Sequence, residues 1–124
     1  AEMDFAAFAE VKDRLCTYES KFQPGSRHYD GIGLKLPADL SPAEYKALRR
    51  TVVEGYRVTG CRDYARLDLR LRDGVFYILD INPNPDISSE TSMACAAEAA
   101  GLSYGAMLSR IVNFAARRHP VFGA

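Results

Sequence analysis

Residues 64–91 read YARLDLRLRDGVFYILDINPNPDISSET, and this stretch decides how the rest of the chain is interpreted. Leucines alternate with charged residues over 66–72, and β-branched and aromatic residues follow over 75–81. Asp73-Gly74 lies between the two runs and is a strong signal for a tight turn. Alternation with a period of two is typical of a strand with one buried face. The stretch therefore predicts a β-hairpin.

The length of the hairpin loop determines which side chains share a face. A three-residue loop with Gly74 left-handed pairs Leu71 with Val75, and it separates apolar from charged side chains better than a two-residue turn does. We therefore predict the longer loop. Its apolar face would carry Leu67, Leu69, Leu71, Val75, Tyr77, Leu79 and Ile81. Its polar face would carry Arg66, Asp68, Arg70, Phe76, Ile78, Asp80 and Asn82.

The polar face is a candidate metal and phosphate site. In this register Arg66 lies opposite Asp80, Asp68 lies diagonally from Asp80, and Asn82 continues the row. Two carboxylates and an amide oxygen suit Mg²⁺, which leaves its other positions to phosphate and water. An arginine beside them would stabilise negative charge on a transferred phosphoryl group. The same pattern also fits a charged strand face that is only solvated.

Residues 82–86, NPNPD, contain two prolines that exclude regular helix or strand. A calcium loop beginning at Asp80 is a poor fit, because Pro85 and Thr91 stand where such a loop requires glycine and glutamate. Three hydroxyl residues then precede a helix predicted from about residue 92: Ser88, Ser89 and Thr91. They would either cap that helix or bind a substrate carboxylate at its N-terminus.

Composition bounds the remaining possibilities. The 124 residues carry 16 basic and 16 acidic side chains, so no net charge favours nucleic acid or a membrane surface. No apolar run approaches 18 residues and no secretion signal opens the chain, so we expect a cytoplasmic protein. Three cysteines without metal or disulfide spacing, Cys16, Cys61 and Cys95, are expected to be reduced and buried.

The flanking segments predict further elements. Residues 23–31 have loop composition and are long enough for a mobile lid, with His28 expected at the surface. Residues 32–36 predict a short strand, which Pro37 ends. Ser41-Pro42-Ala43-Glu44 predicts a capped helix to about Thr59 that covers the apolar face of the hairpin. Gly101 should end the helix over 94–100, and Ser103 should cap a last helix.

The hairpin residues resemble a known family. Arg66-x-Asp68 and Asp80-x-Asn82-x-x-Pro85 are similar to the end of the ATP-grasp domain of D-alanine–D-alanine ligases, where the pattern reads R-x-D … E-x-N-x-x-P-G. Two positions depart from it: Asp80 replaces a glutamate, and Asp86 replaces the glycine.

Segments outside the hairpin extend the resemblance. Glu2-Met3-Asp4-Phe5 is similar to an E-x-D-F segment in the middle of that domain. Thr17 to Phe22 is similar to its Y-x-A-K-Y segment, which borders a loop that closes over the substrates. The resemblance implies that residues 1–124 form a single, partial ATP-grasp domain, the C-terminal subdomain. Its fold would be α+β, a mostly antiparallel sheet with helices on one face.

The resemblance also implies roles for individual residues. Asp68, Asp80 and Asn82 would bind Mg²⁺ or Mn²⁺, and Lys21 with the two aspartates would contact ATP. Arg66 would be catalytic, acting on an acyl phosphate and the oxyanion that follows it. Thr91 and Ser88 would bind substrate. Lys21 by itself also fits an ordinary exposed lysine.

The implied function is an ATP-dependent carboxylate–amine ligase. Its partners would be amino-acid or peptide substrates, together with the N-terminal half of the protein or a second copy of the chain. Because the adenine-binding strands lie outside this sequence, we expect the isolated chain to be inactive. Two alternatives stay open: a non-catalytic, self-associating domain, and a ligase acting on substrates outside cell-wall synthesis.

Overall fold

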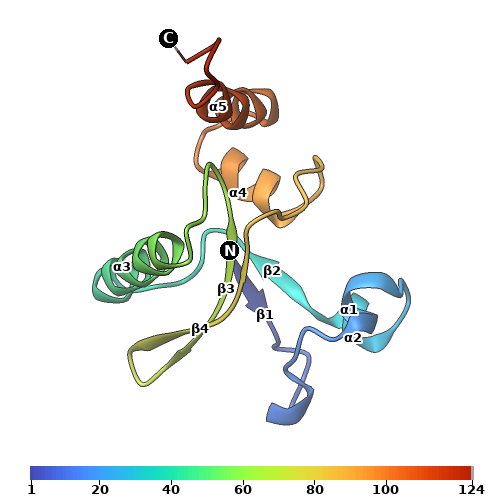
Figure 1. Ribbon diagram of the computed structural model, residues 1–124. Helices are drawn as coiled ribbons and strands as arrows, with labels where there is room; N and C mark the ends of the chain where they lie inside the picture. Colours follow the sequence, from blue (N-terminus) through green and yellow to red (C-terminus); the bar gives the residue numbers. More distant parts are fainter. Residues whose placement is uncertain (124) are drawn as a thin grey trace. The chain divides into compact units, whose positions relative to one another are not determined.

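The structure is a computed structural model that describes residues 1–123, and it divides into two compact units, Ala1–Asp39 and Leu40–Ala124. The first unit holds a small antiparallel sheet, in which β1 (Glu2–Asp4) pairs with β2 (Gly33–Lys35). A 3-10 helix (Val11–Asp13), α1 (Tyr18–Phe22) and α2 (Arg27–Gly31) connect the two strands (Figure 1). The strand predicted over 32–36 is thus confirmed, although it is shorter.

Phe8 forms the interior of the first unit, with only 1% of its surface exposed. The ring of His28 stacks on it at 4.9 Å between centroids, and the Arg27 guanidinium lies 5.2 Å from the ring centre. Two sequence predictions are therefore wrong. Residues 27–31 are helical because Ser26 caps them, accepting a hydrogen bond from the backbone N–H of Tyr29. His28 is partly buried against Phe8.

The second unit is organised around the hairpin of β3 (Arg66–Arg72) and β4 (Val75–Asn82). Helix α3 (Pro42–Val58) precedes it and carries the predicted capping box between Ser41 and Glu44. Helices α4 (Ser92–Ala99) and α5 (Tyr104–Ala116) follow and contact each other (Figure 1). Met107 and Ala94 are buried in these two helices. These three helices agree with their predicted positions.

Helix α3 packs against the hairpin through Gly55. A Cβ atom placed there would lie 2.6 Å from Cδ1 of Ile78, 3.3 Å from Cδ2 of Leu67 and 3.5 Å from Cδ1 of Ile81. Such short distances show that the helix backbone rests directly on these three side chains. The predicted cover of the hairpin's apolar face by this helix is confirmed.

Candidate functional site

The register of the hairpin differs from the predicted one. Arg72 pairs with Val75 across a two-residue turn, in which both Asp73 and Gly74 have positive φ, 52° and 75°. This geometry follows the right-handed twist of the strands and is the usual one for Asp-Gly. The predicted three-residue loop is wrong.

A β-bulge then changes the pairing further along the hairpin. Leu69 pairs with Ile78, but Asp68 pairs with Asp80, so Leu79 is the extra residue. The bulge shifts the parity of β4. Ile78 therefore joins the face that meets α3, and Leu79 is 65% exposed, opposite to the prediction for both residues. Tyr77 is likewise exposed, at 53%.

The bulge brings the four predicted polar residues into one row. Asp68 lies directly opposite Asp80, and Arg66 lies directly opposite Asn82. The expected pairing of Arg66 with Asp80 is therefore wrong. Directly opposite residues have Cβ atoms about 5 Å apart, which is closer than the diagonal spacing expected for the two aspartates. The row places two carboxylates, an amide and a guanidinium on the face away from α3.

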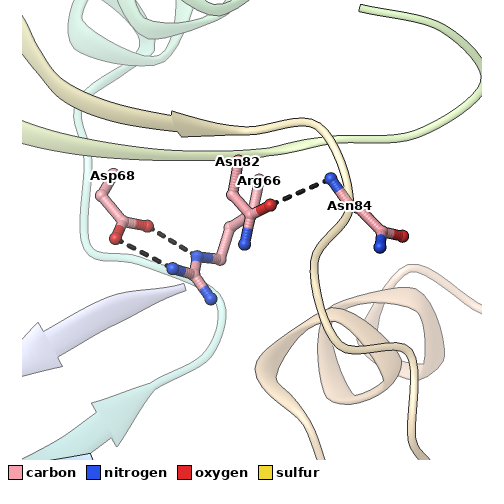
Figure 2. A network of polar contacts seen from close by, with 4 residues as sticks. All are labelled: Arg66, Asp68, Asn82 and Asn84. Carbon is pink, nitrogen blue, oxygen red and sulfur yellow. Dashed lines mark hydrogen bonds and ion pairs between the residues drawn. The ribbon is translucent and has the colours of Figure 1, made fainter.

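Arg66 forms a two-point ion pair with Asp68. Its Nε donates to Oδ1 at 2.8 Å and its Nη2 donates to Oδ2 at 3.2 Å (Figure 2). Both side chains remain accessible to solvent, at 38% and 43% exposure. A carboxylate offers about four lone-pair sites, so these two hydrogen bonds leave Asp68 able to bind a further ligand. Asp80 is exposed beside the pair.

The amide of Asn82 is fixed by the turn that follows β4. Its Oδ1 accepts a hydrogen bond from the backbone N–H of Asn84 at 2.9 Å (Figure 2). Because a backbone N–H only donates, this bond identifies the oxygen end of the amide. Asn84 in turn accepts a hydrogen bond from the hydroxyl of Tyr64 at its Oδ1, at 2.7 Å. Sequence reasoning missed both Tyr64 and Asn84.

Asp86 stands in the irregular segment after Pro85, which is buried. Its Oδ1 accepts hydrogen bonds from the hydroxyl of Ser88 at 2.6 Å and from the backbone N–H of Ser88 at 2.8 Å. The hydrogen bond from the Ser88 hydroxyl has the larger effect and the one from the backbone N–H the smaller, and together they hold the pKa of Asp86 below its usual value. Asp86 is therefore a carboxylate at neutral pH.

Thr91 occupies the N-cap position of α4, but its side chain forms no capping bond. Its hydroxyl donates instead to the carbonyl oxygen of Ser88 at 2.8 Å. The capping role considered for this hydroxyl is therefore wrong. Helix α4 has no acidic residue in its first turn, although Glu90 directly precedes the N-cap.

Lys21 lies in the last turn of α1 and is exposed. It belongs to the first unit, whereas the row and the segment before α4 belong to the second.

The donor set matches the chemistry of a hard cation. Among residues 1–123, no group of three His, Cys, Asp or Glu is placed to hold a metal ion. The row instead offers two carboxylates and one amide oxygen, which is a suitable partial set for Mg²⁺ or Mn²⁺. Repulsion between directly opposed carboxylates is destabilising, and a cation bound at Asp68 and Asp80 would offset it. A calcium loop does not fit, because Asp80 and Asn82 lie within a strand.

Two broader observations concern the whole described chain. Cys16, Cys61 and Cys95 are free; Cys16 is exposed and the other two are partly buried, so the prediction that these thiols are buried is wrong. Within residues 1–123, no helix is both long and apolar enough to cross a lipid bilayer.

Comparison with known sequences identifies relatives of the chain. A family model described as "D-ala D-ala ligase C-terminus" matches residues 5–113. The D-alanine–D-alanine ligase of Pseudothermotoga lettingae is 32% identical over 106 residues, which are 86% of this chain and 34% of that protein. "Uncharacterized protein y4sG" of Sinorhizobium fredii is 39% identical over 106 residues, 85% of this chain and 30% of that protein. The chain thus spans about a third of the length of these relatives.

Comparison with solved structures gives the same result. The crystal structure of D-alanine–D-alanine ligase from Bacillus anthracis complexed with ATP matches with a TM-score of 0.62 and 25% identity, over 64% of this chain and 28% of that one. A second crystal structure of the Bacillus anthracis enzyme matches with a TM-score of 0.65 and 22% identity, over 72% of this chain and 31% of that one. The predicted α+β fold, part of an ATP-grasp domain, is confirmed.

Proposed function

This chain belongs to the D-alanine–D-alanine ligase family, because residues 5–113 match the C-terminal domain of those ligases. From that premise we propose that it is part of an ATP-dependent carboxylate–amine ligase. The observation that carries the proposal is the row on β3 and β4, where Asp68 faces Asp80 and Arg66 faces Asn82. We propose that the reaction takes place in the cytoplasm, where ATP is available. The rest of the protein, or a second copy of this chain, would complete the nucleotide site.

We propose that the row holds the metal and the phosphates. Asp68, Asp80 and Asn82 supply oxygen ligands for Mg²⁺ or Mn²⁺. The family resemblance separately assigns Lys21 to the phosphates of ATP. When bound, the cation neutralises phosphate charge and thereby favours transfer of the γ-phosphoryl group. Asp80 is one methylene shorter than the glutamate of the family pattern, so it reaches less far into the site.

Arg66 is the proposed catalytic residue. Its ion pair with Asp68 holds the guanidinium at the polar row, beside the proposed metal ligands. A guanidinium is permanently charged and planar, so it stabilises negative charge without accepting a proton. Arg66 would therefore stabilise the acyl phosphate and then the tetrahedral oxyanion.

The segment before α4 is the proposed substrate site. Thr91 and Ser88 lie at the positive end of α4, where a substrate carboxylate is favoured. To donate to that carboxylate, each hydroxyl would turn away from its present acceptor, the Ser88 carbonyl for Thr91 and the Asp86 carboxylate for Ser88. Asp86 is charged at neutral pH and would attract the ammonium group of an amino acid or peptide. Because Asp86 stands where the family pattern has glycine, we propose an amino-acid or peptide substrate that need not be D-alanine.

The proposed reaction has two steps that balance. A carboxylate oxygen of the first substrate attacks the γ-phosphorus of ATP, and the bond to ADP breaks to leave an acyl phosphate. The amine of the second substrate then attacks the carbonyl carbon, loses a proton and expels inorganic phosphate. The phosphate therefore carries away one oxygen that began in the substrate carboxylate.

This oxygen transfer provides the test. The protein that contains this chain would be incubated with ATP, Mg²⁺ and amino acids whose carboxylates are labelled with ¹⁸O, beginning with D-alanine. We expect one labelled oxygen in the phosphate for each molecule of ADP formed. Asp80→Asn should abolish the transfer, because it removes a charged metal ligand.

A matched control is available in the same hairpin. Asp73→Asn removes a carboxylate from the exposed turn, and asparagine tolerates the positive φ of that position. This variant should keep the activity. ADP formation without labelled phosphate would contradict an acyl phosphate. Equal activity in wild type and Asp80→Asn would contradict the proposed metal site.

A further inference from the structure

The strand pairing of the hairpin ends at Arg66 and Asn82, but the polar row continues one step further. Tyr64 lies two residues before Arg66, and Asn84 lies two residues after Asn82, both in irregular backbone just beyond the strand ends. Pro83 has no N–H group to extend the ladder. The side-chain hydrogen bond from the Tyr64 hydroxyl to Oδ1 of Asn84, at 2.7 Å, connects the strands at this point.

The backbone leading into Tyr64 is held from a third element. Asp63 has a positive φ of 62°, and its carboxylate accepts hydrogen bonds from two nitrogens of Arg118, which lies two residues beyond the end of α5. The Asp63 side chain is only 14% exposed. Tyr64 itself is partly buried, where a phenol hydroxyl normally requires a polar partner. These contacts fix the direction from which the hydroxyl approaches Asn84.

The hydrogen bonds continue from Asn84 to the row. The Tyr64 hydroxyl holds the side chain of Asn84, and the backbone N–H of Asn84 donates to Oδ1 of Asn82 at 2.9 Å. Oδ1 of Asn82 is also the atom offered to the metal. The position of the Asn82 amide oxygen therefore depends on Tyr64 and Asn84, which lie outside the paired strands of the hairpin.

We infer that Tyr64 is a positioning residue, whose hydroxyl fixes the amide oxygen of Asn82 through Asn84. The inference rests on the proposed function for the role of that oxygen as a metal ligand. The positioning itself is a property of the chain's own hydrogen bonds. The two parts are therefore tested by separate measurements.

The first measurement is hydrogen exchange of backbone amides, followed by NMR. In Tyr64→Phe we expect the Asn84 amide to exchange about two- to tenfold faster, as the loss of one hydrogen bond implies. The amides in the middle of α3 should keep their rates. Tyr77→Phe is the matched control, because it removes a hydroxyl from an exposed side chain of the same hairpin, and it should leave Asn84 unchanged. An unchanged Asn84 rate in Tyr64→Phe, or equal acceleration of all amides, would overturn the inference.

The second measurement is a titration with Mn²⁺ alone, observed through paramagnetic broadening of the Asn82 resonances. We expect Tyr64→Phe and Asn84→Ala to weaken Mn²⁺ binding by similar factors, about two- to tenfold, and the double variant to be no weaker than either. If the wild type binds Mn²⁺ and Tyr64→Phe binds it with the same affinity, the proposed effect of Tyr64 on the metal site is overturned. Absence of broadening in wild type would instead contradict the proposed metal site, while the exchange rates would still decide the positioning.

Discussion

The contact between α3 and the hairpin predicts the outcome of a single substitution, Gly55→Ala. The added Cβ would lie 2.6 Å from Cδ1 of Ile78, which is closer than such atoms approach in proteins. Cδ1 is the far end of the Ile78 side chain, so that side chain would have to turn aside, while Cδ2 of Leu67 and Cδ1 of Ile81 lie 3.3 Å and 3.5 Å from the same Cβ position. Either Ile78 must change its rotamer or the helix must shift away from the hairpin.

Two opposing effects determine how much Gly55→Ala changes the free energy of unfolding. Overpacking of a filled interface costs about 1–3 kcal/mol. Alanine is favoured over glycine inside a helix by about 1 kcal/mol. We therefore expect Gly55→Ala to lower the free energy of unfolding by about 0–2 kcal/mol. Gly105→Ala in α5 is the control, because a Cβ there meets no atom within 4 Å, and it should stabilise by about 0.5–1 kcal/mol.

A second substitution identifies the atom responsible. Ile78→Val removes only Cδ1, and alone it should cost about 0.5–1.5 kcal/mol. In the double variant the clash is gone, so the effects should not add, and a coupling of at least about 1 kcal/mol is expected. Urea denaturation followed by circular dichroism measures the stability of the wild type and of these four variants. Additive effects, or a Gly55→Ala variant as stable as Gly105→Ala, would refute the packing described for α3.

Two further predictions concern charged groups in the second unit. Ser41→Ala should lower the free energy of unfolding by about 1 kcal/mol, because it removes an N-cap. It should also raise the pKa of Glu44, which the Ser41 hydroxyl and backbone N–H hold below its usual value, and NMR titration of the Glu44 carboxyl measures this. Hydrogen bonds from Arg118 lower the pKa of Asp63, so their contribution to stability is complete above the pKa of a free aspartate and is lost as the pH falls through the lowered value. Arg118→Gln should remove that acid dependence from urea-denaturation midpoints measured across this pH range; an unchanged dependence would show that the pair does not stabilise the fold.

The local signals in the sequence located most elements of the second unit. Ser41 and Glu44 predicted the start of α3, and Asp73-Gly74 correctly marked the turn. The register was wrong because regular alternation was assumed along the whole of β4. A bulge at Leu79 is invisible in the pattern, since leucine there and isoleucine before it are both apolar.

The candidate row was still located correctly, for a physical reason. The wrong turn length and the unforeseen bulge change the pairing, but Arg66, Asp68, Asp80 and Asn82 remain on one face. The bond between Tyr64 and Asn84 could not be predicted, because it joins side chains in irregular backbone. A weak signal existed, since both continue the period of two beyond the strand ends.

The first unit was harder to predict because its contacts are distant in sequence. Strand β1 is only three residues long, and its partner β2 lies about thirty residues away. Phe8 and His28 are also distant in sequence and stack only when the chain folds back. Nothing in the local pattern of either segment indicates the other.

The most direct test of the metal and phosphate site is an NMR titration with Mg²⁺ and ADP of the protein that contains this chain. We expect chemical-shift changes that are concentrated at Arg66, Asp68, Asp80 and Asn82. These shifts should persist in Asp73→Asn and disappear in Asp80→Asn. Binding of Mg²⁺ and ADP that leaves those four residues unperturbed, or that survives unchanged in Asp80→Asn, would contradict the account.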